Sequence, residues 1–176
     1  MATYSSASSR HMLADISPAQ IAVAIAGAAL ITILGAWTFE AAGYLPCELC
    51  LKQRWAYYAG IPFALLAAVV CAQGPRSLRG PLFALLALLF VANSAFGVFH
   101  AGVEWGFWQG PTDCTGPLTK ADSINDFLKQ LETVKVVRCD AVAIRILGLS
   151  LAGWNAIICA GLALLALLGL NKSRAR

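Results

Sequence analysis

Six cysteines are the residues of this chain whose type and spacing are best suited to chemistry. Cys47 and Cys50 form a Cys-X-X-Cys motif directly after Pro46, while Cys114 and Cys139 follow farther along the chain. A Cys-X-X-Cys motif can cycle between a dithiol and a disulfide, bind a metal ion or occur by chance. A second cysteine pair on the same side of a membrane favours redox chemistry, because electrons can pass between two dithiols by thiol exchange.

The motif stands where a loop enters a long apolar segment, which places Cys50 near the N-terminus of a predicted helix. Backbone N–H groups and the helix dipole at that position favour a thiolate, the reactive form in disulfide exchange. Arg54 lies four residues after Cys50 and therefore on the same helical face. Its permanent positive charge can stabilise the thiolate or polarise a carbonyl acceptor at the membrane surface.

The composition predicts that the elements positioning these residues lie in a membrane. The chain has 176 residues, of which 59% are hydrophobic and 12% are charged, and its mean hydropathy is +0.71. Apolar segments without period-2 alternation must pair their backbone groups as helices, and a helix needs about 20 residues to cross the hydrocarbon. We predict an all-α integral membrane four-helix bundle with spans over residues 19–39, 51–72, 81–103 and 146–170.

Four crossings place the tails 1–18 and 172–176 and the connection 73–80 on one side of the membrane, and the loops 40–50 and 104–145 on the other. Basic residues without many acidic neighbours mark the first side, at Arg10, Arg76, Arg79, Lys172, Arg174 and Arg176. An excess of Lys and Arg marks the cytoplasm, so we expect both termini there. The first span is too long for the apolar region of a signal peptide and is expected to be an uncleaved anchor.

The loop over residues 104–145 is long enough to suggest a function beyond connecting two spans. Its middle part has apolar residues at three- and four-residue spacing, namely Ile124, Phe127, Leu128, Leu131 and Val134. This pattern predicts a short amphipathic helix that begins with a cap at Asp122 or Ser123. The pattern fits equally a helix on the membrane surface and one that packs on the protein's own spans.

Four further residues within or near the spans have plainer interpretations. Cys71 and Cys159 lie inside predicted spans without another cysteine nearby, and we expect both to pack as small apolar residues. His100 and Glu104, four residues apart, either line a polar pocket or belong to the interfacial belt of the third span.

Because the basic residues do not gather on one face, we predict no nucleic-acid partner.

Several segments together resemble the DsbB-type disulfide bond formation proteins, over nearly the whole chain. They are Leu-Pro-Cys-Glu-Leu-Cys at residues 45–50, Gln-Arg at 53–54, Phe-His-Ala-Gly-Val-Glu at 99–104, Leu-Gly-Leu-Ser at 147–150 and Trp-Asn at 154–155. The pair of loop cysteines is part of the same resemblance. It implies an inner-membrane enzyme with its two cysteine-bearing loops in the periplasm.

The resemblance also implies an electron path through the cysteines. A reduced DsbA-like periplasmic thiol oxidase would attack Cys114, whose pair is Cys139, and Cys139 would then exchange with Cys47. Cys50 would contact the ring of a membrane quinone as a thiolate. The implied function is a thiol oxidase that reoxidises its periplasmic partner and converts a dithiol and a quinone to a disulfide and a quinol.

The same resemblance assigns the quinone contacts. Arg54 matches the quinone-proximal arginine of the family, and His100 stands where the family often has a polar residue near the quinone. The cofactor is expected to be ubiquinone or menaquinone, and no metal is expected.

Two other hypotheses fit part of the pattern. In a non-catalytic membrane protein, the four external cysteines would bind zinc or form structural disulfides, and Cys114 and Cys139 would only staple the loop. A vitamin K epoxide reductase-like protein is also four-helical. That resemblance would place a Cys-X-X-Cys motif on the last helix, where this chain has only Cys159.

Overall fold

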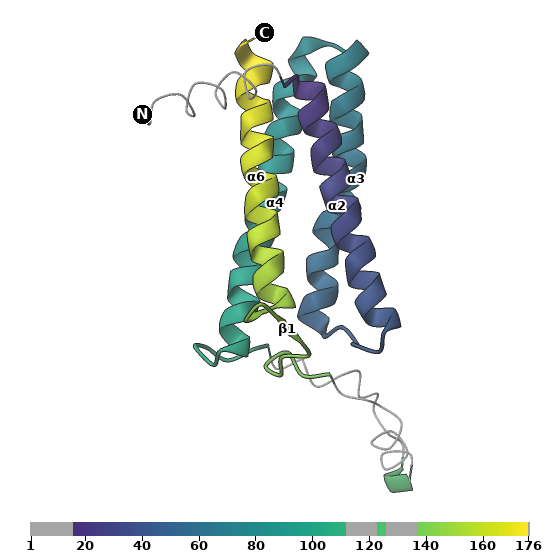
Figure 1. The fold of residues 1–176 in the computed structure, drawn as a ribbon, viewed down its shortest axis with the longest axis vertical. Helices are drawn as coiled ribbons and strands as arrows, with labels where there is room; N and C mark the ends of the chain where they lie inside the picture. Colours follow the sequence, from purple (N-terminus) through teal and green to yellow (C-terminus); the bar gives the residue numbers. More distant parts are fainter. Residues whose placement is uncertain (1–15, 112–122, 126–136, 176) are drawn as a thin grey trace, which may run out of the picture.

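A computed structural model describes residues 16–111, 123–125 and 137–175 (Figure 1). Its four long helices are α2 (Pro18–Ala41), α3 (Glu48–Gln73), α4 (Arg76–Glu104) and α6 (Leu151–Ala175). All four are long and apolar enough to cross a membrane, so the predicted all-α membrane fold is confirmed. Strands within the described residues are limited to the two-residue β1 (Arg145–Ile146) and β2 (Leu149–Ser150).

The four helices run up and down in turn (Figure 1). We call the end of the bundle where α2 and α4 finish and α3 and α6 begin the loop end. The Cys-X-X-Cys motif lies at this end, because Cys47 directly precedes α3. At the opposite end, α3 and α4 are joined by only Gly74 and Pro75, a shorter connection than the expected 73–80.

Helix α4 begins at Arg76, five residues before the expected start of the third span. The expected start was placed where the uncharged run begins, just after Arg79. A basic side chain in the first turns of a membrane helix can extend to the interface, so the charge does not end the helix. Pro75 occupies the N-cap position, with φ −65° and ψ 137°.

Helix α6 begins at Leu151, later than the expected residue 146, because β1 and β2 form an antiparallel hairpin before it. Leu147 and Gly148, between the strands, have φ values of 52° and 84°. Positive φ at both central residues is the mark of a two-residue hairpin turn and is incompatible with a continuing helix. The indole Nε1 of Trp154 donates to the carbonyl oxygen of Ile146 at 2.9 Å, which ties the hairpin to α6.

The bundle core consists of large apolar side chains that meet small ones. Phe83, Phe90, Ile25 and Leu86 are fully buried, and many alanines surround them in the same cluster. Apolar side chains such as Ile31, which is 72% exposed, face outward. Lipid makes that exposure favourable, so burying apolar side chains away from water does not hold these helices together. Small residues that let the helices approach closely stabilise the bundle instead.

The contact between α4 and α6 is the most extensive of the bundle, and Gly97 permits its close approach. A Cβ at Gly97 would lie 2.9 Å from the backbone nitrogen of Ala156. Gly97→Ala is therefore expected to lower the free energy of unfolding by about 1–3 kcal/mol, as overpacking does in other cores. Reversible unfolding in mixed micelles measures this change. Gly161→Ala is the matched control, since nothing lies within 4 Å of its added Cβ, and an equal loss in both variants would contradict the close-approach argument.

Two sequence expectations lie mainly outside the described residues. The amphipathic helix expected around Ile124 to Val134 is described only over residues 123–125, where all three side chains are exposed. The N-terminal tail is described only from residue 16. Its last part caps α2, because the Ser17 hydroxyl accepts from the backbone N–H of Gln20 and the Gln20 side chain accepts from the N–H of Ser17.

Candidate redox site at the loop end

Cys47 is the N-cap residue of α3, and its sulfur takes the place of a capping oxygen. Cys47 Sγ accepts from the backbone N–H of Cys50 at 3.3 Å and lies 2.9 Å from Cys50 Sγ. Both cysteines are free thiols. The extended backbone at Cys47, with φ −75° and ψ 173°, follows Pro46 and turns the sulfur back over the first turn of the helix.

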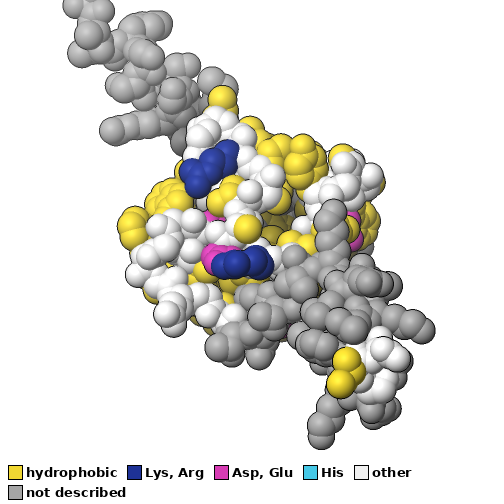
Figure 2. All heavy atoms as spheres, turned by 90° about the horizontal axis from the view of Figure 1, so that it is seen from below, with side chains coloured by type: hydrophobic (Ala, Val, Ile, Leu, Met, Phe, Trp, Pro, Cys, Tyr) yellow, Lys and Arg dark blue, Asp and Glu magenta, His cyan; other side chains and the backbone are white. Residues whose placement is uncertain are grey.

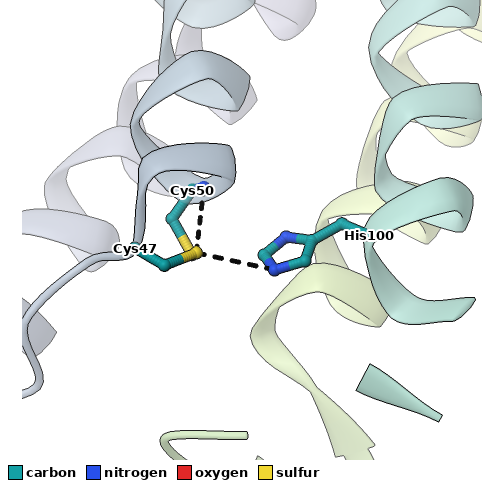
Figure 3. Close-up of side chains that lie close together, drawn as sticks. All are labelled: Cys47, Cys50 and His100. Atoms are coloured by element: carbon teal, nitrogen blue, oxygen red, sulfur yellow. Dashed lines mark hydrogen bonds between the residues drawn. The ribbon is translucent and has the colours of Figure 1, made fainter. Parts of the chain in front are cut away.

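His100 reaches the same sulfur from the facing helix α4 (Figure 3). Its Nε2 lies 3.5 Å from Cys47 Sγ, and its Nδ1 lies 3.2 Å from Nε2 of Gln53. The Gln53 amide nitrogen can only donate, so Nδ1 is the acceptor and the ring proton is on Nε2. His100 is 1% exposed, and this arrangement makes it a donor to Cys47.

These contacts make Cys47 the thiolate of the pair. The hydrogen bond from the Cys50 thiol, with a further contribution from the hydrogen bond of His100, lowers the pKa of Cys47 to about 4 against the effect of burial. The sequence instead suggested Cys50 as the thiolate at the helix N-terminus. Cys50 is the third residue of α3 and acts there as the donor, because the capping position belongs to Cys47.

Cys139 lies beside the Cys-X-X-Cys motif. It is buried, and it shares one small apolar cluster with Cys47, Leu49 and Val103, against which Cys50 also packs. Cys139 is disulfide-bonded. Cys114 lies outside the described residues, so the structure places three of the four predicted redox cysteines together.

A cavity of about 400 Å³ opens next to these thiols. Cys47, Cys50, Arg54, His100 and Glu104 all line it. Most of the remaining wall is apolar and comes from α2, α6 and the segment 137–146. A concave apolar pocket with a few polar groups in its wall is the usual form of a small-molecule site.

Arg54 lies in this wall with a side chain only 12% exposed. Its Nη1 donates to a carboxylate oxygen of Glu40, near the end of α2, at 2.5 Å. The ion pair and a hydrogen bond from Nη2 to the carbonyl oxygen of Ala36 at 3.4 Å hold the guanidinium beside the cavity, and its five N–H groups leave further donors for a ligand. Sequence reasoning missed Glu40, although a lone carboxylate at the end of an apolar span is a signal for a specific partner.

Figure 2 views the loop end, where the described basic side chains have acidic side chains beside them. Lys52 pairs with Glu48, and Arg138 pairs with Asp140. In the described part of this face the charges are therefore mixed.

Of the two cysteines expected to serve only in packing, Cys71 is half-buried near the far end of α3 and is remote from the site. Contrary to the sequence prediction, Cys159 does not pack only as a small apolar residue, because polar atoms lie against its buried thiol. Tyr57 Oη and Asn93 Nδ2 each lie 3.2 Å from its sulfur. Polar residues inside apolar spans could have pointed to this cluster.

Comparison with known proteins places the chain in a family. The family model "Disulfide bond formation protein DsbB" matches residues 18–169. Disulfide bond formation protein B of Verminephrobacter eiseniae is 31% identical over 174 residues, which cover 95% of this chain and 90% of the relative.

Two further relatives cover less of the chain. The protein of the same name from Cupriavidus necator is 32% identical over 65% of this chain and 68% of its own length. An uncharacterized protein of Rickettsia prowazekii is 26% identical over 72% of this chain and 71% of its own length. No solved structure matches the chain significantly. With a family match that spans all four helices, this multi-pass membrane protein belongs to the DsbB family of disulfide bond formation proteins.

Proposed function

We propose that this protein is a membrane thiol oxidase that reoxidises a periplasmic DsbA-like dithiol oxidase and passes the electrons to a membrane quinone. One observation carries the proposal. Disulfide-bonded Cys139 shares a buried cluster with the free thiols Cys47 and Cys50, beside an apolar cavity. A relay needs two cysteine pairs within reach of each other and of an acceptor site.

The outer steps are two thiol–disulfide exchanges. The reduced partner attacks the disulfide between Cys114 and Cys139, is released as a disulfide and leaves both loop cysteines as thiols. The Cys139 thiolate then attacks Cys47 in the oxidised Cys47–Cys50 pair, which forms a mixed disulfide and frees Cys50 as a thiolate. Attack of Cys114 on Cys139 restores the loop disulfide and releases Cys47 as a thiolate.

These exchanges leave the inner pair reduced and the outer pair oxidised, which is the combination seen for Cys47, Cys50 and Cys139. The hydrogen bonds from Cys50 and His100 stabilise the departing Cys47 thiolate. A pair with a stabilised thiolate is a strong oxidant when it is a disulfide, because its reduced form is favoured. The exchange therefore runs inward, from the loop to the motif.

The residues around the cavity fit a quinone. The apolar wall suits a quinone ring and the start of its tail, and Arg54 supplies a charged donor for a carbonyl oxygen. When bound, a quinone accepts two electrons and two protons and becomes a quinol. Cys50 lines the cavity and supplies electrons as the disulfide with Cys47 re-forms.

The proposed orientation places the loop end in the periplasm. Arg76 and Arg79 start α4, and Lys172 and Arg174 end α6, at the opposite end of the bundle. The loop end mixes Arg138 and other basic residues with acidic partners. Orientation follows the excess of Lys and Arg in short segments, so the end with the termini is assigned to the cytoplasm.

The test is quinone reduction by the detergent-purified protein supplied with a reduced DsbA-like protein. We expect steady reduction of ubiquinone-1 or menaquinone-1 by the intact chain and none by Cys114→Ser. Cys71→Ser is the matched control, because that free cysteine lies near the far end of α3, and it should keep full turnover. If the intact protein reduces neither quinone, the oxidase proposal fails.

A second candidate function rests on a specific observation. Among the described residues, the ligand atoms of Cys47, Cys50 and His100 lie within 4.8 Å of one another, close enough to hold a metal ion. A non-catalytic protein with a zinc site there would carry near-stoichiometric zinc after purification. The oxidase proposal expects little zinc and co-purifying quinone, so elemental analysis and quinone extraction separate the two candidates.

Arg54→Gln is expected to raise the KM for quinone by about tenfold, since one charge-assisted hydrogen bond is worth about 1.5–3 kcal/mol and the neutral amide keeps part of it. The loop disulfide should still form, because the described polar contacts of Arg54 are with Glu40 and Ala36 on α2. Initial rates at varied quinone concentration measure the change. Lys52→Ala removes a basic residue that pairs with Glu48 outside the cavity. An equal rise of KM in that control would point to surface charge rather than to a contact of Arg54.

A further inference from the structure

A chain of polar side chains crosses the apolar bundle from α4 to the cavity. Asn93 on α4 donates through Nδ2 to Cys159 Sγ on α6 at 3.2 Å. Cys159 Sγ lies 3.2 Å from Tyr57 Oη on α3, and Tyr57 Oη lies 2.6 Å from Asn155 Oδ1 on α6. Asn93, Tyr57 and Cys159 are buried. Uncharged polar residues within membrane spans commonly hydrogen-bond across helices, so a polar group of this chain that has no partner needs a separate explanation.

The hydrogen bonds of this chain run in one direction. The 2.6 Å separation between Tyr57 and Asn155 fits O–H···O geometry and is shorter than the usual N–H···O range, so Tyr57 donates and Asn155 accepts through its carbonyl oxygen. Tyr57 has one hydroxyl proton, which leaves its oxygen to accept from the Cys159 thiol. Hydrogen bonds aligned in this way polarise one another.

The chain ends on the amide nitrogen of Asn155. Asn155 Nδ2 is buried and has no hydrogen-bond partner among the described residues. An unpaired N–H group in an apolar membrane interior costs several kcal/mol, and such a group calls for a specific explanation. Asn155 lines the cavity together with Arg54 and Tyr57, and its carbonyl oxygen is held by Tyr57, so the wall of the cavity contains a donor in a fixed orientation.

We propose that Asn155 is a second hydrogen-bond donor to the electron acceptor, which binds one carbonyl oxygen from α6 while Arg54 binds the other from α3. This inference rests on the proposed function, since it concerns the quinone of the same site. Tyr57 is a positioning residue that holds the Asn155 amide. Two donors from different helices orient a molecule with two carbonyl groups and select it over apolar molecules of similar size.

Binding of ubiquinone-1 or menaquinone-1 to the detergent-purified protein, measured by equilibrium dialysis without a thiol substrate, tests the inference. Asn155→Leu keeps the side-chain size and removes the donor, and we expect its affinity to fall about tenfold, as the loss of one buried hydrogen bond predicts. Ser94→Ala removes a hydrogen bond between α4 and α6 that is not part of this chain, and Ser94 does not line the cavity. That control should keep its affinity within about twofold.

Infrared spectroscopy of the intact protein gives a second measurement that does not depend on how well a variant folds. With each quinone carbonyl labelled in turn with carbon-13, both bound carbonyl stretches should lie below the frequency of the free quinone, because a donor weakens the C=O bond. One carbonyl at the free frequency, or unchanged affinity in Asn155→Leu, would overturn the inference and leave the proposed function standing. Failure of the intact protein to bind either quinone would overturn both.

Discussion

Replacing Cys47 or Cys50 by serine is expected to lower quinone-dependent turnover by about 10³-fold or more, since a serine hydroxyl can neither form a disulfide nor carry the electrons. The two variants should differ in the disulfide-linked species that accumulates. Cys139 and Cys47 share one buried cluster, and Cys47 is the residue whose thiolate the site stabilises. In Cys50→Ser, Cys47 keeps its nucleophilic sulfur, and only Cys114 can then undo a mixed disulfide between Cys47 and Cys139.

Cys50→Ser in a Cys114→Ser background is therefore expected to trap a Cys47–Cys139 disulfide, because the oxidised partner accepts the two electrons and is released as a dithiol, whereas Cys47→Ser in the same background is expected to accumulate no inner-to-outer disulfide. Peptide mapping of the non-reduced protein by mass spectrometry detects the linkage. Cys71→Ser supplies the control for handling and oxidation, because Cys71 is a free cysteine outside the cavity. A Cys50–Cys139 disulfide in Cys47→Ser, in place of the expected species, would show that the loop thiol attacks Cys50 and would reverse the proposed order.

The sequence predicts the four spans because lipid requires long apolar segments with all backbone groups paired internally, and that constraint acts on every residue. It also predicts the side on which Cys47, Cys50 and Cys139 meet, since parity of crossings needs no side-chain detail. The start of α6 is different. The apolar residues Ile146 to Leu149 look like part of a span, and only the positive φ at Leu147 and Gly148 shows that they form a turn.

The division of roles within the Cys-X-X-Cys motif depends on atomic detail that spacing does not contain. Both cysteines lie within one helical turn of the N-terminus, so the dipole argument applies to either. The outcome depends on which residue is the N-cap and on His100, which is 53 residues away from Cys47 along the chain and directs its Nε2 at that sulfur. Asn155 was visible in the sequence only as part of a family segment. The orientation of its unpaired amide nitrogen depends on Tyr57 in another helix, whose hydroxyl donates to the Asn155 carbonyl oxygen.

The pH dependence of Cys47 reactivity provides the second test with a large expected effect. A pKa lowered from 9 to about 4 keeps Cys47 a thiolate throughout the neutral range. Its alkylation rate in the reduced protein should change by less than about twofold from pH 8 to pH 5, while an ordinary thiol loses about 10³-fold over the same range. The shape of the profile is the measurement, because a lower pKa also reduces intrinsic nucleophilicity. Iodoacetamide labelling with peptide mapping reads each cysteine separately.

His100→Leu separates the contribution of the imidazole from that of Cys50. Loss of the Nε2 donor removes one of the causes that lower the pKa of Cys47, so that pKa should rise and the labelling rate should begin to fall at a higher pH than in the intact protein. The hydrogen bond from Cys50 is the largest cause of the low pKa and remains in this variant. The labelling rate should therefore still begin to fall at a lower pH than that of an ordinary thiol. Gln53→Leu keeps the imidazole but releases its Nδ1, and the ring proton is then free to move from Nε2. Its profile should lie between those of the intact protein and His100→Leu, and a profile equal to that of the intact protein would show that Gln53 does not set the tautomer.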